Sequence, residues 1–216
     1  MNSVYKIYFN IRRKVNQYIR IKYILPKLCK ELKNSNFSII SSNCNGGIIC
    51  HDLGVRFNSP TVNLWMSASD YIKFVSNLER YLNENIVEVK EANVTYPVGL
   101  LGGDIKLYFQ HYDSFEVALE KWKNRRGRVN FNNIFLIMTD RDGCNYDIIK
   151  KFDNLPFKNK VIFTSKKYPD IKSSVYCDIY EADDCVGILS EFYKLSGKRI
   201  YENYFDYVGW LNGVDD

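Results

Sequence analysis

The spacing of apolar and polar positions at the start of the chain predicts a basic amphipathic helix. Over residues 4–25, apolar side chains recur three and four positions apart with basic residues between them, at Val4, Tyr8, Ile11, Val15 and Ile19. Pro26 should break or kink this helix, and a short second helix is expected over residues 27–33.

From residue 35 onward, strand-like and helix-like patterns alternate. The expected strands are 37–42, 62–65, 87–89, 97–101, 104–112, 134–139, 160–164 and 175–179. The expected helices are 69–82, 114–126, 146–152, 183–195 and 202–211, with a short helix or turn over 48–53. This alternation predicts an α/β fold, in which repeated β/α units form a mostly parallel sheet with helices on both faces. Composition changes only near residue 34, so residues 1–34 form a basic helical extension and residues 35–216 a single α/β domain.

Charge is distributed unevenly along the chain. The net charge is +5, but residues 1–34 hold nine basic side chains and one acidic one, so they carry +8 and the remainder −3. A basic helix with an apolar side suits an anionic membrane surface, to which each well-placed Lys or Arg contributes about 1 kcal/mol. The alternative is a helix packed on its own domain with its basic face in solvent. A nucleic-acid partner is not expected, because no recognised binding module accompanies the helix.

Neither a signal peptide nor a membrane-spanning segment is expected. The first residues lack a continuous apolar run, and no stretch approaches the ~18 uncharged apolar residues that a span requires. The six cysteines form no CxxC pair and are expected as free thiols in a reducing cytoplasm: Cys29, Cys44, Cys50, Cys144, Cys177 and Cys185. We therefore expect a cytoplasmic protein that can lie at the inner face of the membrane. Its oligomeric state stays open.

Two carboxylates follow the strongest predicted strand. Asp140 and Asp142 come directly after residues 134–139, and ligands of open α/β sheets bind at the carboxyl ends of strands. Carboxylates at this spacing can share one Mg²⁺ or Mn²⁺ ion and bridge it to a diphosphate. The alternative is a turn, since Asp favours turns, Gly143 supplies a positive φ and Arg141 can pair with a neighbour.

A second polar loop follows the strand at 37–42. Asn43, Cys44 and Asn45 precede Gly46-Gly47, whose backbone amides can hold an anion or simply form a tight turn. Downstream, His51 is a candidate general base oriented by Asp52. Cys44 is a candidate nucleophile with His51 or His111 as its base, or else a small packing residue.

Three arginines close the predicted helix at 114–126. Arg125, Arg126 and Arg128 can form bidentate pairs with a phosphate, or they can interact favourably with the helix C-terminus.

A series of motifs resembles a known bacterial family. The series comprises Ser38–Gly47, His51-Asp52-Leu53-Gly54, Asn58-Ser59-Pro60-Thr61, Tyr96-Pro97-Val98-Gly99, Asp104, His111-Tyr112, Glu120-Lys121-Trp122 with Arg125-Arg126, Thr139–Cys144 and Phe157–Thr164. The family is the bacterial domain of unknown function often described as an exopolysaccharide, or capsular polysaccharide, biosynthesis protein. The resemblance covers residues ~5 to ~211 and implies a compact α/β fold and a link to cell-surface polysaccharide loci. It supplies no proven activity, cofactor or catalytic residue.

The leading hypothesis is therefore an enzyme of surface-polysaccharide assembly that transfers a glycosyl or acyl group to a sugar or lipid-linked sugar. Its expected catalytic residues are His51, Asp52, Asp140 and Asp142. Its expected ligand-binding residues are Asn43, Cys44, Asn45, Asn58, His111, Arg125, Arg126, Arg128 and Arg141. One alternative is a non-catalytic, membrane-peripheral binding or scaffold protein of the same pathway, and another is a Cys-His hydrolase.

Overall fold

The computed structural model describes residues 3–213, and it describes side chains from Ile7 onward. Val4 of the predicted apolar spacing therefore lies outside the described side chains. The chain forms two compact units, which we describe separately. The terminal unit comprises residues 3–35, 52–55 and 187–213, and the central unit comprises residues 36–51 and 56–186. The N-terminal segment, which ends at residue 35, shares its unit with the C-terminal segment.

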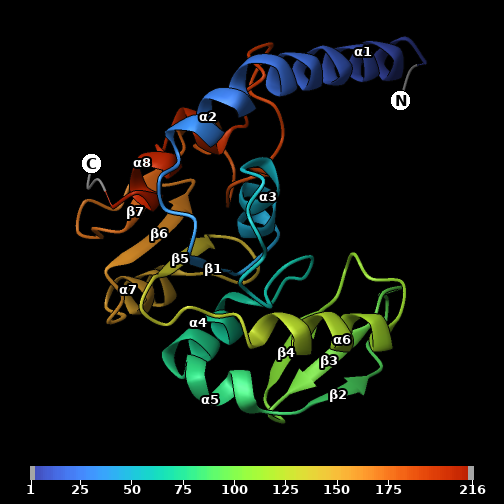
Figure 1. Ribbon diagram of the computed structural model, residues 1–216, viewed down its shortest axis with the longest axis vertical. Coiled ribbons are helices and arrows are strands. Elements are labelled where there is room, and N and C mark those ends of the chain that lie inside the picture. Colours follow the sequence, from blue (N-terminus) through green and yellow to red (C-terminus); the bar gives the residue numbers. More distant parts are fainter. Residues whose placement is uncertain (1–2, 214–216) are drawn as a thin grey trace. The chain divides into compact units, whose positions relative to one another are not determined.

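The terminal unit begins with a nearly continuous helix. Helix α1 (Ser3–Ile19) runs through a π-helical turn, η1 (Arg20–Ile24), into α2 (Leu25–Glu31), as Figure 1 shows. Pro26 does not end the helix, but the regular α-helical pattern is interrupted just before it by the π-helical turn, so the structure has an irregularity here and no break. Across the described residues, no helix is both long enough and apolar enough to cross a membrane.

The predicted helices near the C-terminus are the main errors of the sequence analysis. Residues 183–195 contain no helix, and residues 202–211 form only a 3₁₀ turn, η3 (Tyr201–Asn203), and a short helix, α8 (Tyr207–Leu211). The carbonyls of Phe192 and Lys194 accept hydrogen bonds from side chains of α1, and Lys194 has a positive φ of 53°. These contacts replace the helical hydrogen bonds. Asp206 then interrupts the second predicted helix and caps α8 by accepting from the N–H of Gly209.

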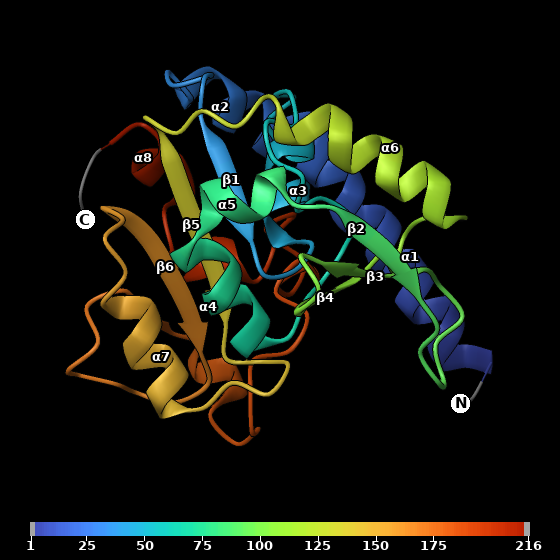
Figure 2. The same cartoon turned by 90° about the horizontal axis from the view of Figure 1, so that it is seen from below.

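The central unit is built on a four-stranded parallel sheet of order β1-β5-β6-β7. The strands are β1 (Ser38–Ser41), β5 (Ile134–Thr139), β6 (Asn159–Thr164) and β7 (Ser174–Tyr176). Helix α3 (Asn45–Asp52) follows β1, and α7 (Tyr146–Asp153) connects β5 to β6. Figure 2 shows β1, β5 and β6 side by side. Every residue of β1 and β5 is buried, as expected for strands covered on both faces.

A second, antiparallel sheet lies between β1 and β5 in the sequence. It consists of β2 (Ile86–Val89), β3 (Val98–Leu101) and β4 (Ile105–Tyr108), in that order. The glycines at 102 and 103 both have positive φ and form the predicted turn between β3 and β4. The expectation of repeated β/α units in one mostly parallel sheet is therefore correct only in part. The fold is mixed α/β with a parallel sheet and a separate antiparallel sheet.

Helices and short turns complete the central unit. The helix predicted over 69–82 is two helices, α4 (Ala68–Ser76) and α5 (Leu78–Asn83), because Asn77 leaves the helical conformation. Helix α6 (Phe115–Arg126) matches its prediction and starts at the Ser114 cap. The strand predicted over 62–65 is wrong, since only Trp65 forms a bridge, to Tyr108. The strand predicted over 175–179 ends early and continues as a 3₁₀ turn, η2 (Asp178–Tyr180).

One hydrophobic core joins both sheets of the central unit to the helices between them. Fully buried side chains from β5, α4 and α6 meet there, among them Leu136, Phe74 and Trp122. The Tyr71 hydroxyl donates to the carbonyl of Ile40 at 2.7 Å, so α4 is also fixed to β1 by a buried hydrogen bond. The core thus holds rigid the strand ends that carry the candidate site.

Candidate functional site

Polar side chains meet where β1 and β5 end. Asn43 Nδ2 donates to the hydroxyl oxygen of Thr139 at 3.0 Å, and Asn43 Oδ1 accepts from the backbone N–H of Asn45 at 3.2 Å. Since β1 and β5 are parallel neighbours, these contacts join their following loops into one polar edge. This is the position where open α/β sheets bind ligands.

Asp140 connects the end of β5 to the segments at Ser165 and Val186 through hydrogen bonds. Its Oδ2 accepts from the backbone N–H and the hydroxyl of Ser165, at 2.6 and 2.9 Å, and its Oδ1 accepts from the N–H of Val186 at 2.8 Å. A carboxylate has about four acceptor positions, so three are already used. The residue is also only 9% exposed. This geometry favours a structural role for Asp140 over catalysis or ion binding.

The metal expected at Asp140 and Asp142 gains no support from the arrangement. Within residues 3–213 there is no group of three or more His, Cys, Asp or Glu side chains that could hold a metal ion. Arg141, which lies between the two carboxylates, donates to the Val186 carbonyl at 3.3 Å. It thereby helps to fix the same loop.

Asp142 lies in the turn that follows β5. It is half-buried, has a positive φ of 56°, and precedes Gly143, whose φ is 82°. Burial raises the pKa of its carboxyl, and the nearby Arg141 charge opposes part of that rise. A carboxyl with a raised pKa can exchange a proton closer to neutral pH, which general acid–base catalysis requires.

The two glycines after Asn45 are explained by packing. A Cβ atom on Gly46 would lie 2.7 Å from Ile39 Cγ2 and 2.9 Å from Ser41 Cβ. On Gly47 it would lie 3.1 Å from Val62 Cγ1. The glycines let α3 approach β1 closely. No bound anion is needed to account for them.

The environment of Cys44 disfavours a thiolate. Its Sγ is 3.9 Å from the carbonyl oxygen of Leu64, and burial raises the pKa of the thiol. Both histidines are exposed, His51 in the last turn of α3 and His111 in the loop after β4. These observations weigh against a Cys44 nucleophile.

Two of the predicted arginines, Arg125 and Arg128, contact Phe57. Arg125 donates to the Tyr112 hydroxyl at 2.6 Å, and its guanidinium lies 5.4 Å from the ring centroid of Phe57. Arg128 donates to the Phe57 carbonyl at 3.4 Å. The Tyr112 hydroxyl in turn donates to the carbonyl of Val62 at 2.8 Å.

The other predicted ligand residues of the central unit have structural partners. Arg126 donates to the carbonyl of Leu82 at 2.9 Å, so it supplies a hydrogen-bond partner for a carbonyl in the last turn of α5. Asn58 donates to the carbonyl of Phe37 at 3.3 Å, which fixes the segment before β1. Neither contact involves a residue of the polar edge.

Asp52 belongs to a buried charge cluster in the terminal unit. Its Oδ2 accepts from Arg20 Nη2 at 2.7 Å and from Arg199 Nε at 2.6 Å, while Arg20 also pairs with Glu202 at 2.7 Å. Burial alone would raise the pKa of Asp52, but the hydrogen bonds and charges of Arg199 and Arg20 lower it overall. The Asp52 carboxylate therefore stays ionised at neutral pH and neutralises the two arginines. Its predicted role as the partner that orients His51 is not supported.

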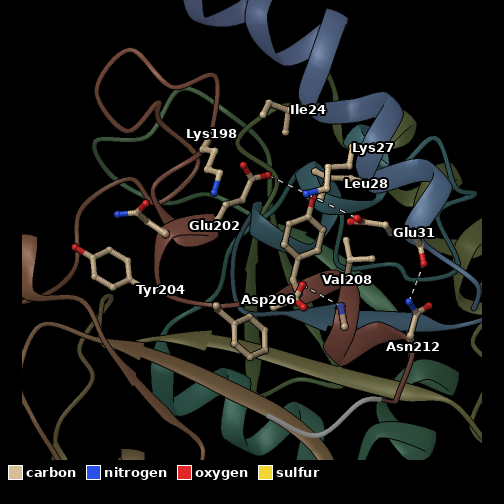
Figure 3. Close-up of a pocket in the computed structure, with 14 residues that line it drawn as sticks. Ile24, Lys27, Leu28, Glu31, Lys198, Glu202, Tyr204, Asp206, Val208 and Asn212 are labelled. Atoms are coloured by element: carbon tan, nitrogen blue, oxygen red, sulfur yellow. Dashed lines mark hydrogen bonds and ion pairs between the residues drawn. The ribbon is translucent and has the colours of Figure 1, made fainter.

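The terminal unit also contains a pocket that sequence reasoning missed. Its volume is about 660 Å³, within the range of small-molecule sites. Figure 3 shows side chains from α2, from the segment before α8 and from the C-terminal end of α8 around one space, including Lys27, Lys198, Glu202, Tyr204 and Asn212. Residues 201–212 contain three tyrosines, two asparagines and one aspartate, a sequence signal that could have indicated the pocket.

Comparison with known proteins identifies the family. A family model described as "Domain of unknown function (DUF1919)" matches residues 15–212. An "Uncharacterized protein" of Haemophilus influenzae is 43% identical over 202 residues, covering 94% of this chain and 96% of that protein. Both matches span the terminal and the central unit. The chain therefore belongs to the DUF1919 family.

Proposed function

We propose that this protein takes part in building cell-surface (exo- or capsular) polysaccharide, by transferring a glycosyl or acyl group to a sugar or lipid-linked sugar. The observation that carries the proposal is the polar edge of the parallel sheet. There Asp142, a half-buried carboxyl with a raised pKa, follows β5, and the amide of Asn43 bridges β1 to β5. The resemblance of the motif series to polysaccharide-associated proteins supplies the substrate class.

The residues suggest a division of roles. Asp142 would take the proton of the attacking sugar hydroxyl as that oxygen bonds to the donor carbon. The donor's leaving group would depart with the bonding electron pair, and Arg125 would offset its negative charge if it carries phosphate. Asn43 and Asn45 would orient sugar hydroxyls through amide hydrogen bonds. Asp140 would keep the loops in place without touching substrate.

The pocket of the terminal unit is a second place where a sugar could bind. Its aromatic, amide and charged side chains can contact the apolar faces and the hydroxyls of a sugar. A Tyr204→Ala substitution that weakens sugar binding without changing Asp142-dependent transfer would assign the pocket to an auxiliary site.

The proposal is tested by a thermal-shift screen followed by a transfer assay. The ligands are UDP-, GDP-, CMP- and dTDP-sugars and acyl-CoAs, each with and without Mg²⁺ or Mn²⁺. A ligand at ~100 times its Kd stabilises the native state by roughly 2.7 kcal/mol, which is readily visible. We expect one donor class to bind both wild type and Asp142→Asn, and only wild type to transfer it.

Asp113→Asn is the matched control, because Asp113 is an exposed carboxyl in the loop before α6. It should leave both binding and transfer unchanged. Failure of every donor to shift the melting temperature would overturn the proposal.

A non-catalytic binding or scaffold protein of the same pathway is the second candidate. It is favoured by the structural engagement of Asp52 and Asp140, two of the four expected catalytic residues. Donor binding without any transfer by the wild-type protein would select this candidate over the enzyme.

A further inference from the structure

Helix α1 is attached to its own unit by polar side chains. Arg12 donates to the carbonyl of Phe192 at 3.4 Å. Asn16 donates to the carbonyl of Lys194 and accepts from the N–H of Gly197, both at 2.9 Å. Positions 12, 16 and 20 lie four residues apart on one helix face, and the third, Arg20, enters the buried charge cluster. The contact face of this amphipathic helix is therefore its polar one.

The apolar face of α1 is left in solvent. Ile7, Tyr8, Ile11, Val15 and Tyr18, which we call the apolar stripe, lie on one side of the helix and are between 41% and 60% exposed. An amphipathic helix on a globular unit normally turns this face inward. The reversal leaves a row of large apolar side chains without cover from the rest of the described chain. Rows of this kind mark interaction surfaces.

The charges beside the stripe indicate what covers it. Lys14 and Lys22 are exposed on this side of the helix, and the first acidic residue of the chain is Glu31. The Lys22 ammonium donates to the Tyr18 hydroxyl at 3.0 Å and lies 5.3 Å from the centroid of the Tyr23 ring. Aromatic rings with a polar tip, next to cations on long stems, suit the boundary between water and lipid.

Other occupants fit these observations less well. A second copy of the helix would bring two strongly basic segments together without acidic partners between them. A nucleic acid would meet the charges but would not cover the apolar side chains. An anionic bilayer satisfies both features at once.

We propose that α1 lies in the plane of an anionic membrane surface, with the apolar stripe among the acyl chains and Lys14 and Lys22 against the headgroup phosphates. The attachment is peripheral and uses one face of one helix. It requires no particular reaction, so it holds or fails separately from the proposed function.

The test is flotation of the full chain with vesicles of phosphatidylcholine alone or mixed with phosphatidylglycerol. We expect flotation with the anionic vesicles, and at least about tenfold weaker binding to the neutral ones. The double variant Ile11→Ser/Val15→Ser should weaken binding to anionic vesicles by about tenfold or more, because it removes two inserted side chains. Lys14→Glu/Lys22→Glu should do the same by charge.

Ile188→Ser is the matched control, since Ile188 is 60% exposed, close to the 57% of Ile11, but lies outside α1. It should bind like wild type. All variants should keep the wild-type melting temperature, because the changed side chains are exposed. Two results would overturn the proposal. One is failure of wild type to float, and the other is binding that Ile11→Ser/Val15→Ser leaves unchanged. Sedimentation velocity tests whether a second copy of the chain covers the apolar stripe instead. A dimer that Ile11→Ser/Val15→Ser abolishes would identify that occupant.

Discussion

Replacing Asp52 with Asn should strongly destabilise the terminal unit. In the folded protein the Asp52 carboxylate pairs with Arg20 at 2.7 Å and with Arg199 at 2.6 Å. The side chains of Arg20 and Asp52 are only 1% and 4% exposed, so water screens the pair little. Glu202 also pairs with Arg20, so the four side chains form a neutral group of two cations and two anions. Asn keeps the shape of Asp but leaves one buried positive charge uncompensated.

The expected loss follows from that imbalance. Removing one partner of a buried ion pair typically costs about 3–5 kcal/mol, because the remaining charge stays buried without compensation. We expect a loss of this size for Asp52→Asn in the free energy of unfolding, measured by urea titration at pH 7. Glu191→Gln, an exposed carboxyl change in the same unit, should stay within about 0.5 kcal/mol of wild type.

Acid provides a second readout of the same interaction. The pKa of Asp52 is lowered in the folded state, so its contribution is fully present above the ordinary carboxyl value of 3.8 and is lost as pH falls through the folded value. The stability difference between wild type and Asp52→Asn should therefore be constant from pH 7 to about pH 5 and shrink below about pH 4. A difference under about 1 kcal/mol at pH 7, or one that does not shrink in acid, would refute this account of the cluster.

Three further predictions concern the central unit and the thiols. Gly46→Ala should destabilise the protein by about 1–3 kcal/mol in urea titration, because its Cβ would lie 2.7 Å from Ile39; a neutral result would mean that α3 can shift freely. Asp140→Ala should cost about 3 kcal/mol or more in the same assay, since three donors lose their acceptor, and unchanged stability would contradict its structural role. In iodoacetamide labelling at pH 8 read by mass spectrometry, exposed Cys29 should react in the native protein. Cys50 should react only after unfolding, because burial raises its pKa to about 12; fast native labelling of Cys50 would contradict this.

Local patterns in the sequence were sufficient for the centre of the fold. The apolar run at 134–139 is a buried parallel strand, and a polar loop follows it, as predicted. Ser114 caps α6 as expected. These features depend on neighbouring residues, so a single sequence contains the information. The separate antiparallel sheet was harder to predict, because an alternation of strands and helices does not reveal which strands pair.

Long-range polar contacts explain where prediction from the sequence failed. Asp52 was expected to orient His51, but its partner Arg199 is 147 residues away in the chain. In the segment expected to be a helix at 183–195, the carbonyls of Phe192 and Lys194 accept instead from the side chains of Arg12 and Asn16, and Phe192 forms a bridge with Arg199. The amphipathic pattern of α1 was correctly identified, yet nothing in that pattern shows that its polar face would be the anchored one. Pairings of this kind follow from the tertiary structure and leave no periodic signal.

The most direct test of the proposed function is the amount of surface polysaccharide made by a bacterial strain that lacks this gene. The strain is complemented with wild type, Asp142→Asn or Asp113→Asn, with protein levels matched by immunoblot. We predict that polysaccharide falls in the deletion strain and is restored by wild type and Asp113→Asn but not by Asp142→Asn. Unchanged polysaccharide in the deletion strain, or full restoration by Asp142→Asn, would contradict the central claim.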